Sequence, residues 1–171
     1  LKPFTNVLPK PLIPYNKTTI IEEIISNFQK AGIEKFFISL NSKSEIIHNY
    51  LKTKDLKKTQ YVIEKEFLGT CGAIFLLKNK IKSDDFILSN CDILINSNFK
   101  DIYDYHISNR NHLTLIAVSK SFKIPYGICN LNKFKLLKNI EEKKEFNFLI
   151  NSGCYIFNKK IFNLFSKKKT N

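Results

Sequence analysis

Apolar positions recur with a helical period near the start of the chain. The apolar set Ile21, Ile24, Ile25 and Phe28 is spaced three or four residues apart, which places its members on one face of a helix. Thr19 and Glu22 form a capping box at its start, and Gly32 offers a place for the helix to end. A second capping box at residues 42–45 predicts another helix that runs through Leu51.

Short apolar blocks separate these helical segments. Blocks that favour strands lie at residues 36–40, 61–63, 86–89 and 113–118, and further helices are expected at 71–77 and 99–108. Strand and helix therefore alternate about every 25–30 residues up to residue 118, which is typical of α/β proteins. We predict a doubly wound, mostly parallel mixed sheet with helices on both faces.

The pattern changes after residue 118. Consecutive strands are expected at 126–131, 135–141 and 149–157, with a hairpin turn at 132–133 and a last helix at 161–165. These segments predict antiparallel strands added to the parallel sheet. Residues 1–171 are interpreted as one incomplete domain with halves 1–118 and 119–171.

Composition restricts the cellular setting. Apolar residues make up 43% of the chain, which is typical of a globular protein. There is no apolar run of the roughly 20 residues that a membrane span needs, and no signal-peptide core. The four cysteines are far apart and form no zinc pattern, so reduced thiols and a cytoplasmic location are expected, with no membrane partner.

The charge is strongly basic, with 28 basic and 15 acidic residues and a net charge of +13. A nucleic-acid-binding module is therefore one candidate. However, Arg110 is the sole arginine, and arginine is the residue preferred for reading bases. Lysine and asparagine enrichment is also what an AT-rich genome encodes. The expectation is no nucleic-acid partner.

The first residues contain a lysine between two prolines, Pro9-Lys10-Pro11. Proline fixes its own φ and pushes the preceding residue toward extended conformations. A cation held in this way suits a phosphate ligand. The alternative is a plain extended connector whose lysine points at water.

Further candidates follow the predicted strands, because open α/β sheets bind ligands outside the carboxyl ends of their strands. Glu64 could accept hydrogen bonds from a ligand, and Gly69 would let a flat ligand approach the backbone. Asp92 is well placed to hold Mg²⁺ between phosphates. The alternatives are an exposed loop glutamate and an aspartate that caps a turn. Asp84 and Asp85, at the opposite end of that strand, are weaker candidates.

The second half offers polar turns and glycines. Gly127 and Gly153 could leave space against a sugar ring, Glu142 could accept from hydroxyls, and Lys143 could pair with a phosphate. The alternative for the charged run is a solvated turn. The three histidines form no metal-binding pattern and are expected on helix surfaces or in loops; they are His48, His106 and His112.

Taken in order, these motifs resemble those of the sugar-phosphate nucleotidylyltransferases. The matching segments are Leu1–Thr5, Pro9–Pro11, Leu68–Ala73, Asn90–Asp92, Tyr126–Gly127, Glu142–Lys143 and Asn151–Gly153. The resemblance spans nearly the whole chain. It implies a Rossmann-like, GT-A-like fold, with residues 1–118 as the nucleotide-binding half and residues 119–171 as part of the sugar-phosphate half.

The resemblance also implies a Mg²⁺-dependent reaction between a nucleoside triphosphate and a hexose or hexosamine 1-phosphate, which gives a nucleotide sugar and pyrophosphate. Lys10 would be catalytic and Asp92 would hold the metal. The substrate-binding residues would be Glu64, Gly69, Thr70, Asn90, Gly127, Glu142, Lys143 and Asn151.

The form of the motif at residues 90–92 is similar to that of a bacterial subgroup, often fused to CBS domains, that is linked to guanylyl transfer. GTP is therefore the favoured nucleotide. The family's glycine-rich loop would lie upstream of Leu1 and its second metal aspartate beyond Asn171, so we expect the fragment alone to be inactive. A non-catalytic regulatory relative that binds nucleotide or sugar phosphate is the alternative, and the sequence leaves a homo-oligomer open.

Overall fold

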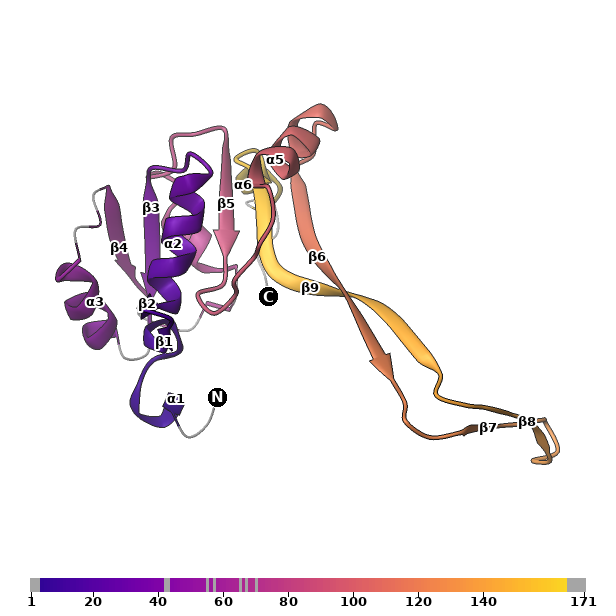
Figure 1. The fold of residues 1–171 in the computed structure, drawn as a ribbon. Helices are drawn as coiled ribbons and strands as arrows, with labels where there is room; N and C mark the ends of the chain where they lie inside the picture. The colour runs from indigo at the N-terminus through magenta and orange to yellow at the C-terminus, as the bar shows by residue number, and fades with distance from the viewer. Residues whose placement is uncertain are drawn as a thin grey trace. The chain divides into compact units, whose positions relative to one another are not determined.

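The computed structural model describes residues 4–41, 44–54, 56, 58–64, 66, 68–69 and 71–165 (Figure 1). It divides the chain into two compact units. Unit 1 contains residues 1–114 and 153–171, and unit 2 contains residues 115–152. Strands β6 (Leu113–Lys123) and β9 (Glu145–Asn158) each run from one unit into the other.

Unit 1 begins with α1 (Phe4–Val7), the 3₁₀ helix η1 (Lys10–Leu12) and the short pair β1 (Pro14–Tyr15) and β2 (Thr18–Thr19). Helix α2 (Ile20–Lys30) then starts at the predicted capping box, in which the Thr19 backbone N–H donates to Glu22 Oε2 at 2.9 Å. The four apolar positions predicted for one face of α2 are all buried. The predicted capping residue Ser42 lies outside the described residues, and α3 is described from Ser44 to Lys52.

The parallel part of the sheet is formed by β3 (Phe36–Leu40) and β4 (Thr59–Ile63), which pair from Phe36 with Thr59 to Leu40 with Ile63. α2 and α3 pack their apolar faces into the same core as β3. This core consists of Leu12, Ile21, Ile25, Leu40, Ile47 and Leu51. Burying these side chains is what holds η1 and its lysine next to the sheet.

The second sheet has the order β5-β9-β6. β9 pairs antiparallel with β5 (Asp85–Ser89), from Asp85 with Asn158 to Ser89 with Cys154. The helices of this region are α4 (Ala73–Leu76), α5 (Phe99–Ser108) and α6 (Ile161–Phe165). The mixed α/β class, with antiparallel strands added late in the chain, is confirmed.

Unit 2 contains the predicted hairpin, formed by β7 (Ile128–Leu131) and β8 (Leu137–Glu141). The turn is longer than the two residues expected, because the Asn132 backbone N–H donates to the Leu136 carbonyl at 2.9 Å. β6 and β9 are also longer than predicted. In unit 2 most side chains of β6 and β9 are exposed. A sequence pattern that depends on burying apolar side chains therefore did not indicate how far these strands extend.

The expectation that all histidines are superficial is wrong for His106, whose side chain is 1% exposed. It lies on α5 between Asp85 and Thr114, and its Nδ1 atom is 2.8 Å from Thr114 Oγ1. The four cysteines, all within the described residues, form no disulfide. Within the described ranges, no helix combines the length and apolar character that crossing a membrane requires.

Candidate functional site

The predicted phosphate lysine and metal aspartate lie together in unit 1. Lys10 Nζ is 3.5 Å from Asp92 Oδ2, although the two residues are 82 positions apart. Their side chains are 56% and 29% exposed, so both can reach a ligand from solvent. In Figure 1 the carboxyl ends of β3, β4 and β5 point toward the side of unit 1 where α1 and β1, the elements on either side of η1 in the chain, are drawn.

The backbone around Lys10 differs from the extended form expected from its prolines. Pro9 is extended, with ψ of 141°, but Lys10–Leu12 form one 3₁₀ turn in which Leu12 N–H donates to the Pro9 carbonyl at 2.9 Å. Pro11 supplies a helix-compatible φ and needs no donor at this first turn. Pro11 and Leu12 are buried and Lys10 is exposed, so the turn anchors itself in the core and presents its cation.

The loop that carries Asp92 is held by contacts on two sides within unit 1. Asn90 N–H donates to the Gly153 carbonyl at 3.0 Å. Gly153 has a φ of +79°, and a Cβ there would lie 2.5 Å from Asn90 Nδ2. The space that Gly153 leaves is therefore filled by Asn90, which is a packing reason for glycine at this position.

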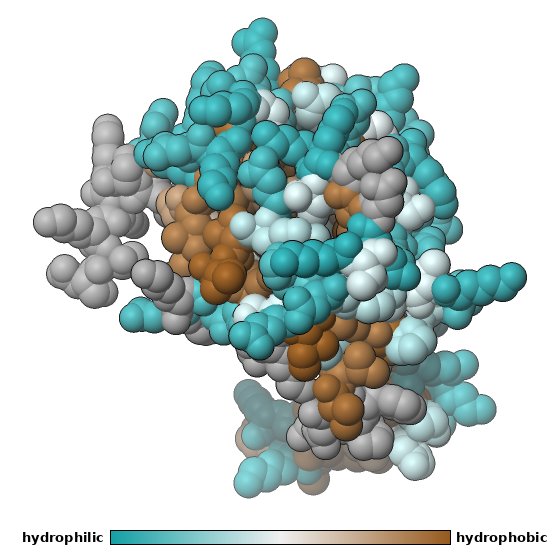
Figure 2. Space-filling view, turned by 90° about the vertical axis from the view of Figure 1, so that its left-hand side faces the viewer, coloured by the Kyte–Doolittle hydropathy of each residue, from teal (hydrophilic) through white to brown (hydrophobic). Residues whose placement is uncertain are grey.

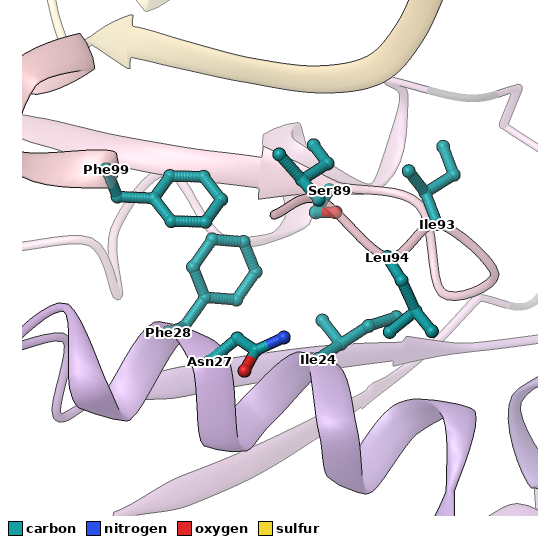
Figure 3. Close-up of a pocket in the computed structure, with 8 residues that line it drawn as sticks. Ile24, Asn27, Phe28, Ser89, Ile93, Leu94 and Phe99 are labelled. Atoms are coloured by element: carbon teal, nitrogen blue, oxygen red, sulfur yellow. The ribbon is translucent and has the colours of Figure 1, made fainter. Parts of the chain in front are cut away.

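On its other side the loop packs against α2 (Figure 3). Ile93 and Leu94 face Ile24 across a small, mainly apolar cavity of about 10 Å³. Phe28 and Phe99 close one side of it, with ring centroids 4.8 Å apart. A cavity of this size is at the lower limit for one water, so it secures the loop and does not hold a substrate.

Glu64 directly follows β4, as expected. Its backbone N–H donates to the Leu40 carbonyl at 2.8 Å, and its Oε1 accepts a hydrogen bond from the Ser39 hydroxyl. Sequence reasoning missed Ser39, although a polar residue near the end of an apolar strand is a usable signal. Gly69 has a φ of +75°, which favours glycine, and Thr70 lies outside the described residues.

The remaining candidates belong to unit 2, where Gly127 and Glu142 are in contact. A Cβ on Gly127 would lie 2.8 Å from Glu142 Oε1. Lys143 occupies the turn after β8 with a φ of +49°, and Asn151 is exposed on β9. Beside them Lys144 donates a hydrogen bond to Glu141 at 2.6 Å, which together with Asn130 lowers the pKa of the Glu141 carboxyl. The structure thus brings Lys10 next to Asp92 in unit 1 and Glu142 close to Gly127 in unit 2.

A metal site would have to be built on Asp92. Among the described residues there is no group of three or more histidine, cysteine, aspartate or glutamate side chains that could hold an ion. Mg²⁺ nevertheless binds through one or two carboxylates, waters and substrate phosphates. The Asp92 carboxylate, partly exposed and next to a lysine suited to phosphate, fits that mode.

One face of the molecule is mainly polar. Figure 2 shows one face covered mostly by hydrophilic side chains, with smaller apolar areas between them. This agrees with the 28 basic and 15 acidic residues of the chain.

Comparisons with known proteins identify the family of the chain. The sequence profile described as nucleotidyl transferase matches residues 1–171. The D-glycero-alpha-D-manno-heptose 1-phosphate guanylyltransferase of Campylobacter jejuni is 31% identical over 172 residues, which cover 97% of this chain and 74% of that protein. The mannose-1-phosphate guanyltransferase of Debaryomyces hansenii is 29% identical over 180 residues, covering 99% of this chain and 49% of that protein. The chain therefore spans about half the length of the fungal relative.

The fold is also similar to that of a solved structure. HddC from Yersinia pseudotuberculosis, complexed with GMP-PN, superposes with a TM-score of 0.70 at 25% sequence identity. The match covers 90% of this chain and 69% of that one. With the profile matched from end to end and the motif residues Lys10 and Asp92 side by side, this chain belongs to the nucleotidyl transferase family.

Proposed function

We propose that the protein containing this chain transfers a nucleotidyl group from a nucleoside triphosphate, with GTP favoured, to a hexose or hexosamine 1-phosphate. The products are a nucleotide sugar and pyrophosphate. The observation that carries the proposal is the 3.5 Å approach of Lys10 Nζ to Asp92 Oδ2 at the carboxyl ends of the strands. The names of the similar guanylyltransferases support the choice of reaction and base.

In this reaction an oxygen of the sugar 1-phosphate attacks the α-phosphorus, and the bond to the bridging oxygen of pyrophosphate breaks. The protein contributes positioning and charge neutralisation. Lys10 places one ammonium against the reacting phosphates. Asp92 is the residue proposed to hold Mg²⁺, which supplies further positive charge when bound.

The base would be bound by the segment after β4. Guanine carries hydrogen-bond donors at N1 and N2, and the Glu64 carboxylate is an acceptor. Because the Ser39 hydroxyl donates to Oε1 and orients the carboxylate, Oε2 is the oxygen proposed to face a base. Gly69 and Thr70 complete the proposed base pocket.

The sugar phosphate would be bound by Asn90 and by the unit 2 group. Glu142, seated against Gly127, can accept from sugar hydroxyls. Lys143 offers a cation and Asn151 an amide. We also propose a cytoplasmic location, because no disulfide joins Cys71, Cys91, Cys129 and Cys154, as is usual in a reducing compartment.

A pyrophosphate-release assay on the full-length protein tests the proposal. The four nucleoside triphosphates are crossed with mannose, glucose, heptose and hexosamine 1-phosphates in the presence of Mg²⁺. The expected result is pyrophosphate release that needs a sugar 1-phosphate and is fastest with GTP. If GTP binds in calorimetry but no pair of substrates releases pyrophosphate, the non-catalytic regulatory alternative is the correct one.

A further inference from the structure

A second pocket lies in unit 1 at the start of β5, the opposite end of the strand from Asp92. Its volume is about 240 Å³. The lining residues that matter are Asp85, His106, Arg110, His112, Asn158 and Lys160. With a rise of roughly 3.3 Å per strand residue, the four steps from Asp85 to Ser89 place about 13 Å of β5 between this pocket and the loop that carries Asp92.

The wall of the pocket contains a buried histidine with an unused donor position. His106 is 1% exposed, and its Nδ1 contacts the Thr114 hydroxyl, which accepts from Asn111 Nδ2 at 3.1 Å. The Thr114 hydroxyl can therefore donate to Nδ1, which places the imidazole proton on Nε2. Within the described part of the chain, Nε2 has no hydrogen-bond partner.

The carboxylate nearest to Nε2 is engaged elsewhere. Asp85 Oδ1 is 3.4 Å from Nε2 but out of line for a hydrogen bond, and it accepts from Asn158 Nδ2 at 2.7 Å. Asp85 Oδ2 accepts from the Tyr103 hydroxyl at 3.2 Å. Leaving a buried donor without a hydrogen bond costs free energy, so an acceptor better placed than Asp85 Oδ1 would be favourable at Nε2.

The pocket is also lined by unpaired positive charge. Among the described residues, neither Arg110 nor Lys160 forms an ion pair with a carboxylate. The nearby Asp84 is held by Lys159 at 2.5 Å, which lowers the pKa of its carboxyl. Because Asp84 is paired with Lys159, it is not a direct ion-pair partner of Lys160.

Arg110 is held in an unusual backbone conformation. Its φ is +52°, a region that favours glycine or asparagine, and its N–H donates to the Ile107 carbonyl at 2.9 Å. Arg110 lines the pocket, and among the described residues its guanidinium is in no ion pair with the Asp85 carboxylate or with any other. The Asn111 N–H also donates to the His106 carbonyl at 3.1 Å, so Arg110 is the left-handed residue that ends α5.

We propose that this pocket binds a small phosphate-bearing molecule at a site separate from the one proposed for nucleotidyl transfer. Arg110 would hold the phosphate with its planar fork of donors, Lys160 would add a point charge, and His106 Nε2–H would donate to an oxygen. A volume of about 240 Å³ lies below the range for drug-sized ligands, so it suits a phosphate or a small sugar phosphate.

Inorganic phosphate is the probe, added to the 171-residue chain at constant ionic strength and followed through the histidine ring signals in NMR. Saturable binding should shift the rings of His106 and His112. Arg110→Gly removes the guanidinium and also relieves the positive φ, so it should keep or raise the melting temperature while weakening phosphate binding about tenfold or more. Arg110→Lys should lie between the two.

Lys10→Ala is the matched control, because it removes the phosphate lysine of the other site and should leave these shifts unchanged. The proposal is wrong if wild-type chain shows no saturable shift of His106. It is also wrong if Arg110→Gly titrates like the wild type, or if Lys10→Ala abolishes the shifts. These outcomes do not depend on pyrophosphate release, so they are independent of the proposed reaction.

Discussion

At the scale of single residues, the structural roles of some glycines and of one aspartate become visible only in the three-dimensional contacts. The Asn151–Gly153 motif is recognisable in the sequence, but not that Gly153 leaves room for Asn90, 63 positions earlier. Similarly, Asp85 is a charge before a strand in the sequence, and in the structure it is a hydrogen-bond acceptor for Tyr103 and Asn158. Polar networks of this kind join positions that are far apart in the sequence, so no local sequence pattern predicts them.

Replacing Gly153 with alanine should therefore destabilise the chain by roughly 2–3 kcal/mol, because the new Cβ meets Asn90 and the φ of +79° is strained for alanine. Gly32→Ala is the matched control. Its φ is +87° but a Cβ there meets nothing within 4 Å, so the expected loss is only about 1 kcal/mol. Urea unfolding of both variants checks this prediction. Equal losses of unfolding free energy would show that Asn90 moves aside without cost and would contradict it.

At the scale of elements, the amphipathic helices and apolar strands could be predicted well. Helix α2 carries both a sequence-local cap and an apolar face, so its start and its buried side agree with expectation. The lengths of β6 and β9 could not be predicted, because their outer parts lie in the small unit 2 and have little apolar burial. The 3₁₀ turn at Lys10 was also missed, since proline restricts φ without deciding ψ.

The cap of α2 makes a pH-dependent contribution to stability. Partial burial would raise the pKa of Glu22, but hydrogen bonds from Tyr50, Lys54 and Thr19 outweigh it and lower the pKa from 4.5 to about 2. The folded pKa lies below the unfolded one, so the contribution is complete above pH 4.5 and is lost as the pH falls toward 2. After allowance for solvent screening it is on the order of 1–2 kcal/mol.

Glu22→Gln should consequently cost about 1–2 kcal/mol of unfolding free energy at pH 7 and less than half of that at pH 3. Urea denaturation of the wild type and the variant at both pH values measures the difference. A gap between the two proteins that is as large at pH 3 as at pH 7 would contradict the hydrogen-bonded carboxylate described here.

At the scale of the whole molecule, the order of motifs indicated the family and the class of site before the fold was known. The order of motifs could not predict which residues contact one another in the folded chain. Lys10 and Asp92 meet because η1, anchored by the buried Pro11 and Leu12, and the loop after β5 lie at the same edge of unit 1. The burial of His106 and the basic pocket beside it had no sequence signal, because one histidine and one arginine form no motif.

The most direct test of the central claim is pyrophosphate release from GTP and a sugar 1-phosphate by the full-length protein carrying Asp92→Asn. We expect kcat/KM to fall by about 10³-fold or more with the fold intact, since the residue proposed to hold the metal loses its charge. Asp84→Asn, at the opposite end of β5 and paired with Lys159, should retain wild-type activity. Full activity of Asp92→Asn would contradict the account.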